Sequence, residues 1–298
     1  MTSSSTGHIF SHLTELKRTG SYIARGAAIL CLILLAFGAS SASGAVGIGG
    51  NIHQGIESQP EEFDHGAFDR LLHQNVRSGL VDYDGFAASL EFPRYLASLA
   101  RANPDRMPRE EQLAFWINAY NAYTIQLIIK HHERESIRNI NRSFGFVKGH
   151  GPWTEKLAVV SGHAYGLDEI ENDIIRPRFH EPRIHFAIVC ASIGCPSLRS
   201  EAYAGVHLDA QLDDQARLFL LRSPLKNSVD VKSRIVRVSP IFINFSNYIN
   251  DFGGSERAVG RFIGKYYPEG RERELLLSGS FKMVQTKYDW SLNSEHRS

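Results

Sequence analysis

The sequence predicts a single α+β domain whose helical N-terminal half packs on a small mixed or antiparallel sheet. Apolar residues recur at helical spacing before residue 131, which favours helices. Short β-type runs follow, and the run 184–190 is apolar on both faces apart from one histidine, which favours a central strand. With 43% hydrophobic and 22% charged residues, the 298-residue chain has the composition of a globular protein.

Residues 1–45 have the three parts of a secretory signal. A polar stretch with Lys17, Arg18 and Arg25 precedes the apolar run 26–39, and small residues follow. The apolar run is shorter than the ~20 residues that a membrane-spanning helix needs. We therefore expect cleavage, with an uncleaved anchor as the alternative, and both place the rest of the chain outside the cytoplasm.

The charge balance argues against a nucleic-acid binder. The chain has 33 basic and 32 acidic residues, a formal net charge of +1, and its basic excess lies within residues 1–45. A nucleic-acid or membrane-surface protein typically has a basic segment or face. We expect an unknown small molecule or protein as partner, and membrane contact only through an uncleaved signal anchor.

The remainder divides into a linker, one domain and a short tail. Residues 46–62 form the linker, in which 51–61 are polar and patternless; 63–293 form the domain, and 294–298 follow it. The expected helices are 63–77, 86–102, 110–131, a short one near 168–176, and 208–221. The expected β-hairpins are 156–165 and 229–238, and 241–252, 258–266 and 281–290 are the last elements.

The helix at 110–131 is apolar almost all round, which is typical of a buried helix. It nevertheless contains Asn118 and Asn121, which are three residues apart and so share a face. A buried amide costs roughly 1–3 kcal/mol unless it is hydrogen-bonded. The two asparagines therefore either hold a neighbouring loop or orient a catalytic group in a pocket.

A metal site at the strand-like run is excluded by spacing. His185 and Cys190 are five residues apart, which on one continuous strand is roughly 16 Å with the side chains on opposite faces. Zinc–ligand bonds are about 2.0–2.3 Å. We expect no metal and no cofactor.

Cys190 and Cys195 lie in the loop after this run and can meet, because the residues between them can turn the chain. One interpretation is a local disulfide, which an oxidising compartment favours. Another makes Cys190 a nucleophile, with backbone amides near Ser192 binding an oxyanion. The base would be His150, with His163 and His207 as alternatives. A buried, unreactive thiol is the third interpretation.

Other side chains near this loop are candidates for substrate binding. Arg199 suits an anionic group, although arginines near acidic residues are more often in ion pairs. Trp116 and Trp153 are also candidates. They belong to a set of aromatic residues whose default role is core packing, which also includes Tyr120, Tyr248 and Trp290. Ser192 and Cys195 lie in the loop itself. The glycine-rich stretch 144–153 lacks the strand and helix of a phosphate-binding loop.

Several motifs together resemble the DUF547 family, a domain of unknown function. They are Gly79–Tyr83, Ala114–Ala122, Leu167–Glu171, Pro182–Pro196, Asp251-Phe252 and Tyr288–Asn293. The resemblance implies a single domain and a secreted or periplasmic protein of the bacterial envelope. It also marks the 116–121 helix and the 185–195 segment as the signature, with the first cysteine position the more regular one, which favours Cys190.

Two hypotheses of function follow. The first is a cysteine-dependent hydrolase or acyltransferase, with Cys190 as nucleophile, His150 as base, Asn118 or Asn121 orienting and Arg199 binding substrate. The second is a non-catalytic domain that binds a ligand or a protein and whose cysteines are structural. The family resemblance names no activity and so does not choose between them.

Overall fold

The computed structural model describes residues 62–141, 151–243 and 248–296. The predicted signal at 1–45 and nearly all of the linker at 46–62 lie outside this range. The described residues belong to one compact unit with α+β structure. Within them, no helix is long and apolar enough to span a bilayer.

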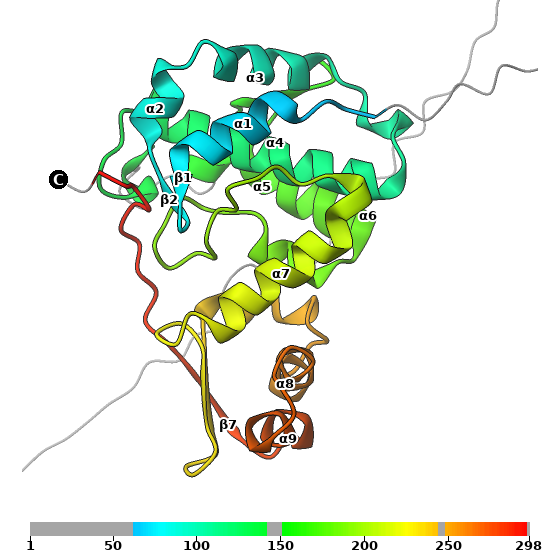
Figure 1. The fold of residues 1–298 in the computed structure, drawn as a ribbon, viewed down its shortest axis with the longest axis vertical. Helices are drawn as coiled ribbons and strands as arrows, with labels where there is room; N and C mark the ends of the chain where they lie inside the picture. The colour runs from blue at the N-terminus through cyan, green and yellow to red at the C-terminus, as the bar shows by residue number, and fades with distance from the viewer. Residues whose placement is uncertain (1–61, 142–150, 244–247, 297–298) are drawn as a thin grey trace, which may run out of the picture. The chain divides into compact units, whose positions relative to one another are not determined.

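The N-terminal part is helical, as predicted (Figure 1). Its elements are α1 (Gly66–Asn75), β1 (Val76–Arg77), β2 (Leu80–Val81), α2 (Tyr83–Ala88), α3 (Glu91–Arg101) and α4 (Arg109–Lys130). Helix α4 is buried along most of its length. The single helix predicted at 86–102 is instead two, because Ser89 is extended and its hydroxyl accepts a hydrogen bond from the Glu91 amide (3.1 Å).

A hairpin and a continuous helical stretch follow α4. They comprise β3 (Ala158–Val160), β4 (His163–Tyr165), α5 (Leu167–Glu169), the π-helical η4 (Ile170–Ile175) and α6 (Arg176–Phe179). The hairpin was predicted, but the helix continues past Pro177, where the sequence suggested an end. A π-helical turn is wider than an α-helical one, and this width accommodates the proline, which has no N–H.

The predicted central strand at 184–190 is wrong. Pro182–Phe186 forms the 3₁₀-helix η5, and the chain continues without regular structure. Asn121 on α4 accounts for the difference, because its side-chain amide binds the backbone there. It donates to the Ala187 carbonyl and accepts from the Val189 amide, at 2.9 Å each. One side chain thus supplies bonds that a neighbouring strand would otherwise make.

The C-terminal part contains the mixed sheet. Its elements are α7 (Leu208–Leu221), β5 (Ser228–Asp230), β6 (Ile235–Val238), η7 (Pro240–Phe242), η8 (Tyr248–Asn250), α8 (Glu256–Gly264), α9 (Arg271–Ser278) and β7 (Lys282–Gln285). Strand β6 lies between β5, which is antiparallel to it, and β7, which is parallel. The sequence indicated the β5–β6 hairpin but not α9.

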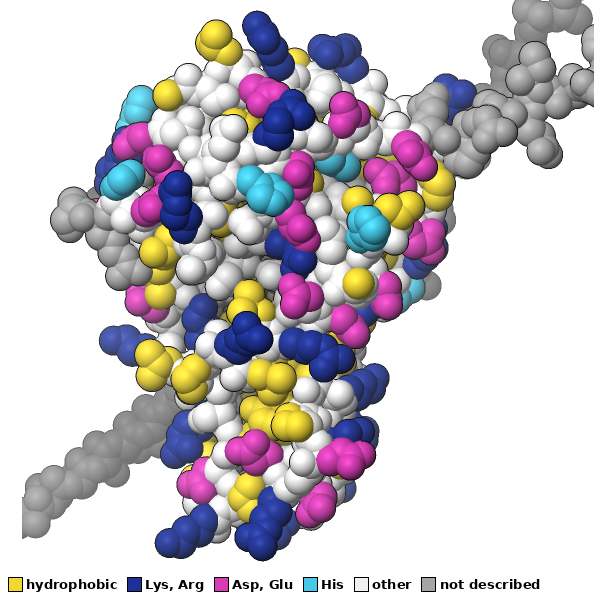
Figure 2. All heavy atoms as spheres, in the orientation of Figure 1, with side chains coloured by type: hydrophobic (Ala, Val, Ile, Leu, Met, Phe, Trp, Pro, Cys, Tyr) yellow, Lys and Arg dark blue, Asp and Glu magenta, His cyan; other side chains and the backbone are white. Residues whose placement is uncertain are grey.

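Two buried apolar clusters support these parts. One surrounds α4, and the other joins α7 to the sheet, α8 and α9, with Phe186 in its interior. Tyr288 packs against both. On the face shown in Figure 2, acidic and basic side chains are intermixed, and apolar side chains gather near the middle and lower parts.

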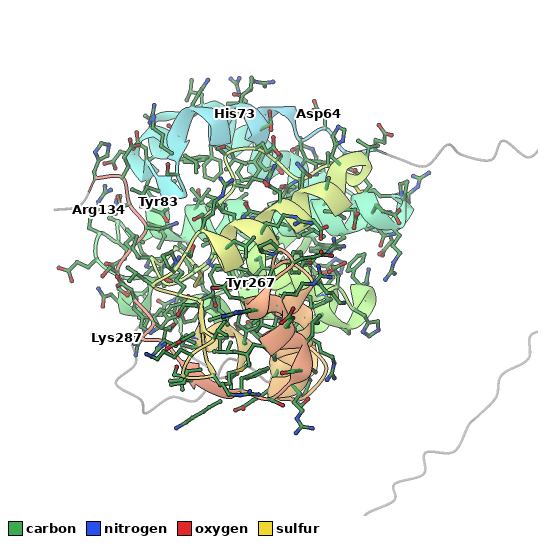
Figure 3. The ribbon with its side chains drawn as sticks, turned by 60° about the horizontal axis from the view of Figure 1, so that its bottom comes forward. Asp64, His73, Tyr83, Arg134, Tyr267 and Lys287 are labelled. Carbon is green, nitrogen blue, oxygen red and sulfur yellow. A yellow bond between two sulfur atoms is a disulfide. The ribbon has the colours of Figure 1, made fainter. Side chains whose placement is uncertain are left out.

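The C-terminal segment, residues 286–296, returns from β7 to the N-terminal helices. The Tyr83 hydroxyl, labelled in Figure 3, donates to Asn293 Oδ1 (2.6 Å), and the Val81 amide donates to the Asn293 carbonyl (2.8 Å). Leu292 forms a β-bridge with Ser192, which lies in the loop Cys190–Cys195, called the cysteine loop below. The C-terminal segment therefore lies between β2 and the loop that contains both cysteines.

We expect Asn121→Ala to lower the free energy of unfolding by about 3 kcal/mol. The substitution leaves a buried carbonyl and a buried amide without partners, at roughly 1–3 kcal/mol each. Urea titration measures the loss, with Asn139→Ala as the control because that side chain is exposed. Equal effects of the two substitutions would show that Asn121 does not hold the 187–189 backbone.

Candidate functional site

A pocket of about 300 Å³ lies beside the cysteine loop. Its lining combines aromatic rings, two carboxyl groups, one imidazole and both cysteines, from Tyr120, Trp153, Asp168, Glu171, His185, Ile188, Cys190, Cys195, Pro196, Ile241, Tyr248, Tyr288 and Trp290. Over the described ranges, no three His, Cys, Asp or Glu side chains are grouped to share a metal ion. The volume and lining are typical of a site for a small organic molecule.

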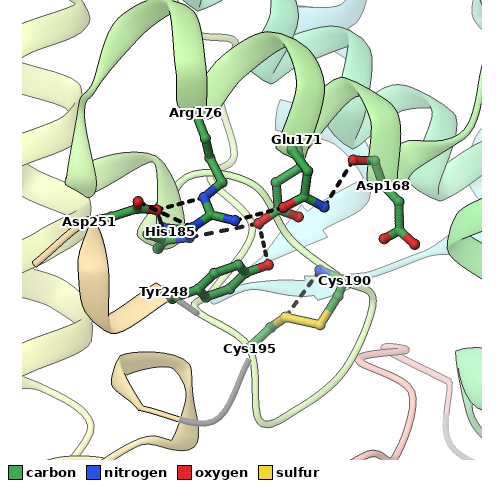
Figure 4. A network of polar contacts seen from close by, with 9 residues as sticks. Asp168, Glu171, Arg176, His185, Cys190, Cys195, Tyr248 and Asp251 are labelled. Atoms are coloured by element: carbon green, nitrogen blue, oxygen red, sulfur yellow. Dashed lines mark hydrogen bonds and ion pairs between the residues drawn. A yellow bond between two sulfur atoms is a disulfide. The ribbon is translucent and has the colours of Figure 1, made fainter. Parts of the chain in front are cut away.

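Cys190 and Cys195 form a disulfide, one of the interpretations that the sequence left open (Figure 4). Donors surround both sulfurs. The Tyr288 hydroxyl donates to Cys195 Sγ (3.1 Å) and lies 3.1 Å from Cys190 Sγ. Ser192 Oγ is 3.3 Å from Cys190 Sγ, and the Cys190 amide donates to Cys195 Sγ at 3.0 Å. Cys195 is buried, whereas Cys190 is partly exposed.

The C-terminal segment fixes the shape of the cysteine loop. The amides of Ile193 and Gly194 donate to the carbonyls of Ser291 (2.8 Å) and Asp289 (2.7 Å). A Cβ at Gly194 would come within 2.8 Å of the Tyr288 ring, so only glycine permits this approach. The amides of Ile193 and Gly194 are therefore not available to bind an oxyanion, because backbone carbonyls already accept from them.

A polar network forms the opposite side of the pocket (Figure 4). His185 Nε2 is 2.7 Å from Asp251 Oδ2, and Arg176 donates to the same oxygen from Nε at 2.6 Å. The Tyr248 hydroxyl donates to Glu171 Oε1. The Tyr248 ring stacks on His185 with centroids 4.0 Å apart. These contacts connect η4, η5 and η8.

Burial and charge set the protonation of this network. Burial raises the pKa of Glu171 to about 7, although Tyr248 and Arg176 oppose the shift. Burial would also raise the pKa of Asp251, but hydrogen bonds from His185 and Arg176 outweigh it and hold the value at about 2. Burial lowers the pKa of His185, with Asp251 partly opposing, so we infer a neutral imidazole at pH 7.

One buried nitrogen of this network has no hydrogen-bond partner among the residues that the structure describes. Because Asp251 is ionised, the neutral His185 ring donates to it from Nε2, which leaves a lone pair on Nδ1. His185 Nδ1 is buried without a partner, and its nearest carboxylate oxygen, Glu171 Oε1, is 3.8 Å away. Both of these atoms are acceptors when Glu171 is ionised, so a donor would complete this part of the pocket.

The pocket brings together part of the predicted site. Cys190, Cys195 and Trp153 line it, and Ser192 contacts the Cys190 sulfur. His150, the predicted base, lies outside the described residues. The alternatives His163 and His207 are exposed and do not line the pocket.

Other predicted site residues lie elsewhere. Asn118 binds both backbone groups of Tyr203 (2.8 and 2.9 Å), as Asn121 binds the 187–189 backbone, so both asparagines hold loops. Trp116 packs against Tyr165 in the core. Arg199 forms ion pairs with Glu201 and Asp214.

Sequence reasoning missed the residues opposite the disulfide. A continuous strand over 184–190 would place His185 and Cys190 too far apart to share a site. In the structure both residues line one pocket. Tyr248 was assigned to core packing, and Glu171 and Asp251 appeared only as parts of family motifs. Those motifs were the available signal, since they contain Glu171, His185, Asp251 and Tyr288.

Glu171→Gln should change how stability depends on pH. The folded-state pKa of about 7 is above the usual 4.5, so protonated Glu171 contributes stability that is full below pH 4.5 and is lost as pH rises through 7. Between pH 4.5 and pH 7 the free energy of unfolding of the wild type should fall by about 3 kcal/mol relative to that of Glu171→Gln. Urea titrations from pH 4.5 to 8 test this, with exposed Glu274→Gln as control. If the difference in the free energy of unfolding between the wild type and Glu171→Gln does not vary with pH, the prediction is wrong.

Comparison with known proteins identifies part of this chain. No curated protein and no solved structure matches it. A family model described as "Protein of unknown function, DUF547" matches residues 104–220. This range includes Glu171, His185 and both cysteines. It does not include Tyr248 and Tyr288, which also line the pocket, or Asp251, which binds His185 behind it. The resemblance that the motifs suggested is thus confirmed over residues 104–220, the part of the chain that matches DUF547.

Proposed function

We propose that this protein is a cysteine-dependent enzyme whose reactive group is the Cys190–Cys195 pair, and that its reaction is thiol–disulfide exchange with a small thiol. The observation that supports the proposal is the disulfide in the pocket lining, with hydrogen-bond donors at both sulfurs. The bonded pair can undergo this reaction as it stands, whereas an acyl transfer first requires a free thiol.

The exchange proceeds in two displacements. A substrate thiolate attacks Cys190 Sγ, the partly exposed sulfur; a new S–S bond forms there, and the bond to Cys195 breaks. Cys195 Sγ keeps the electron pair. A second substrate thiolate then attacks the substrate sulfur of the mixed disulfide and releases Cys190. The substrate loses two electrons as it becomes a disulfide, the protein gains them, and another disulfide compound reoxidises it.

The donors around the sulfurs favour the leaving thiolate. The Cys190 amide and the Tyr288 hydroxyl already donate to Cys195 Sγ. Their fixed dipoles therefore stabilise the negative charge that develops on this sulfur. The hydroxyls of Ser192 and Tyr288 lie 3.3 and 3.1 Å from Cys190 Sγ, and rotation of either would let it donate to that sulfur when it is released. In the structure the Ser192 hydroxyl donates to the Tyr288 oxygen. Lowering the pKa of a leaving thiol speeds its departure.

We further propose that the enzyme works outside the cytoplasm, in the periplasm or as a secreted protein. The signal-like segment 1–45 supports export. The disulfide also supports it, because structural and catalytic disulfides persist in oxidising compartments.

Hydrolysis or acyl transfer by reduced Cys190 is the second candidate. The favouring observation is His185, which Asp251 orients and whose second nitrogen has no hydrogen-bond partner beside the pocket. This arrangement would replace His150 as the predicted base. It requires reduction first, and the amides near Ser192 do not supply the oxyanion donors. If the reduced protein cleaves thioesters and does not exchange disulfides, this candidate replaces the first.

The two single-cysteine variants should react at different rates with a neutral disulfide probe. Cys195→Ala leaves Cys190 partly exposed in the pocket, whereas Cys190→Ala leaves only the buried Cys195. We expect dipyridyl disulfide to react about tenfold faster with Cys195→Ala, because access limits the buried sulfur. Absorbance of the released thione measures both rates. A faster reaction of Cys190→Ala would place the attacked sulfur at Cys195.

Tyr288→Phe should make the disulfide harder to reduce. The change removes a hydroxyl within 3.1 Å of both sulfurs, and a hydrogen bond to a charged group contributes about 1.5–3 kcal/mol. We expect the equilibrium with dithiothreitol to shift about tenfold toward the disulfide, measured by alkylation and mass spectrometry. Tyr266→Phe is the control, since that hydroxyl contacts Asp213 instead. A structural disulfide would respond equally to both variants.

A further inference from the structure

The pocket surface opposite the disulfide has the charge that suits a cation. Asp168 and Glu171 supply carboxyl groups, and none of the lining residues in the described part of the chain is Lys or Arg. Tyr120, Trp153 and Trp290 add aromatic rings, whose faces attract ammonium groups. Arg199, the predicted anion-binding residue, does not line the pocket.

Among the described residues, one buried acceptor in this surface lacks a donor, and the carboxylate oxygen beside it accepts from the Tyr248 hydroxyl. His185 Nδ1 carries a lone pair, is buried and has no hydrogen-bond partner within the described part of the chain, and Glu171 Oε1 lies 3.8 Å from it. A hydrogen bond spans about 2.8–3.0 Å, so one nitrogen can lie at that distance from both atoms. An ammonium group, with three N–H donors and no acceptor, matches this pair, whereas a carboxylate does not.

The nearby protein cations do not fill this position. Arg176 lies over the Tyr248 ring, 4.9 Å from its centroid, and forms an ion pair with Asp251. Lys226 donates to the Cys195 carbonyl at 2.5 Å. Neither side chain belongs to the pocket lining. Among the described residues, Asp168 and Glu171 are thus the charged side chains of the pocket lining.

We propose that the substrate of this site is a small aminothiol, a thiol that carries an ammonium group. Glu171 and His185 accept hydrogen bonds from the ammonium, and its sulfur attacks Cys190. The inference rests on the proposed thiol–disulfide exchange and adds the substrate class. In the covalent step the thiol first loses its proton to water. The S–S bond to Cys190 then forms, the bond between Cys190 and Cys195 breaks, and Cys195 keeps the electron pair.

A series of small thiols of different charge tests the inference on the oxidised full chain. Cysteamine, mercaptoethanol and mercaptopropionate are similar in size and are cationic, neutral and anionic. Rates of disulfide reduction come from timed acid quenching, alkylation and mass spectrometry, each divided by the thiolate fraction. We expect cysteamine to react at least about tenfold faster than mercaptoethanol, and mercaptopropionate to be slowest.

Glu171→Gln tests whether this carboxyl causes the preference. The ratio of the cysteamine rate to the mercaptoethanol rate should fall at least about fivefold, and a ratio within one variant is insensitive to general changes in reactivity. Glu274→Gln, which changes an exposed carboxyl on α9, should keep the wild-type ratio. If both variants lower the ratio equally, the net charge of the protein causes the preference and the inference fails.

Ethanolamine, which has the ammonium group but no thiol, provides a measurement that needs no variant. It should slow the reduction of the wild type by cysteamine, and ethylene glycol at the same concentration should not. If all three thiols exchange but their rates do not follow their charges, the aminothiol inference is overturned and the proposed function stays intact. No exchange with any of the three thiols would overturn the proposed function, and ethanolamine binding measured by calorimetry would then test the ammonium site alone.

Discussion

The side-chain amide of Asn121 is the interaction on which the site depends. Its two hydrogen bonds, to the Ala187 carbonyl and the Val189 amide, let an apolar segment cross the core without a neighbouring strand. Asn118 does the same for Tyr203, one helical turn away. A buried helix with two amides on one face therefore serves as a scaffold for irregular backbone. Such backbone can place side chains where the alternation of a strand could not.

This scaffold explains how His185 and Cys190 come to line one pocket. In a strand, five residues would separate them by roughly 16 Å and place them on opposite faces. A 3₁₀-helix at Pro182–Phe186 followed by irregular chain removes that constraint. The C-terminal segment then closes the loop from the other side, because the carbonyls of Asp289 and Ser291 accept from its amides. Tyr288 is thereby held against both sulfurs.

Ionising the carboxyl groups of the buried network opposite the disulfide costs free energy. Hydrogen-bond donors offset this cost more fully at Asp251 than at Glu171. Asp251 accepts hydrogen bonds from Arg176 and His185 and remains ionised, whereas burial dominates at Glu171 and raises its pKa to about 7. His185 lies between them, neutral and with one nitrogen unpartnered. Carboxyl groups with such different environments are typical of sites that bind or transfer protons, although ion-pair networks also produce them. Here the unpartnered nitrogen and the pocket favour a ligand.

The local features of this protein could be predicted from its amino-acid sequence. Helical periodicity located α1, α4 and α7, turn residues located the β3–β4 and β5–β6 hairpins, and the family motifs marked the 185–195 segment. Only the tertiary structure decided that the apolar run 184–190 is not a strand, because a short apolar run fits either state until its backbone partners are known. The pocket also depends on the tertiary structure, since Glu171, Tyr248 and Tyr288, which line it, are far apart in sequence. Folding brings them to the disulfide through contacts that no local pattern encodes.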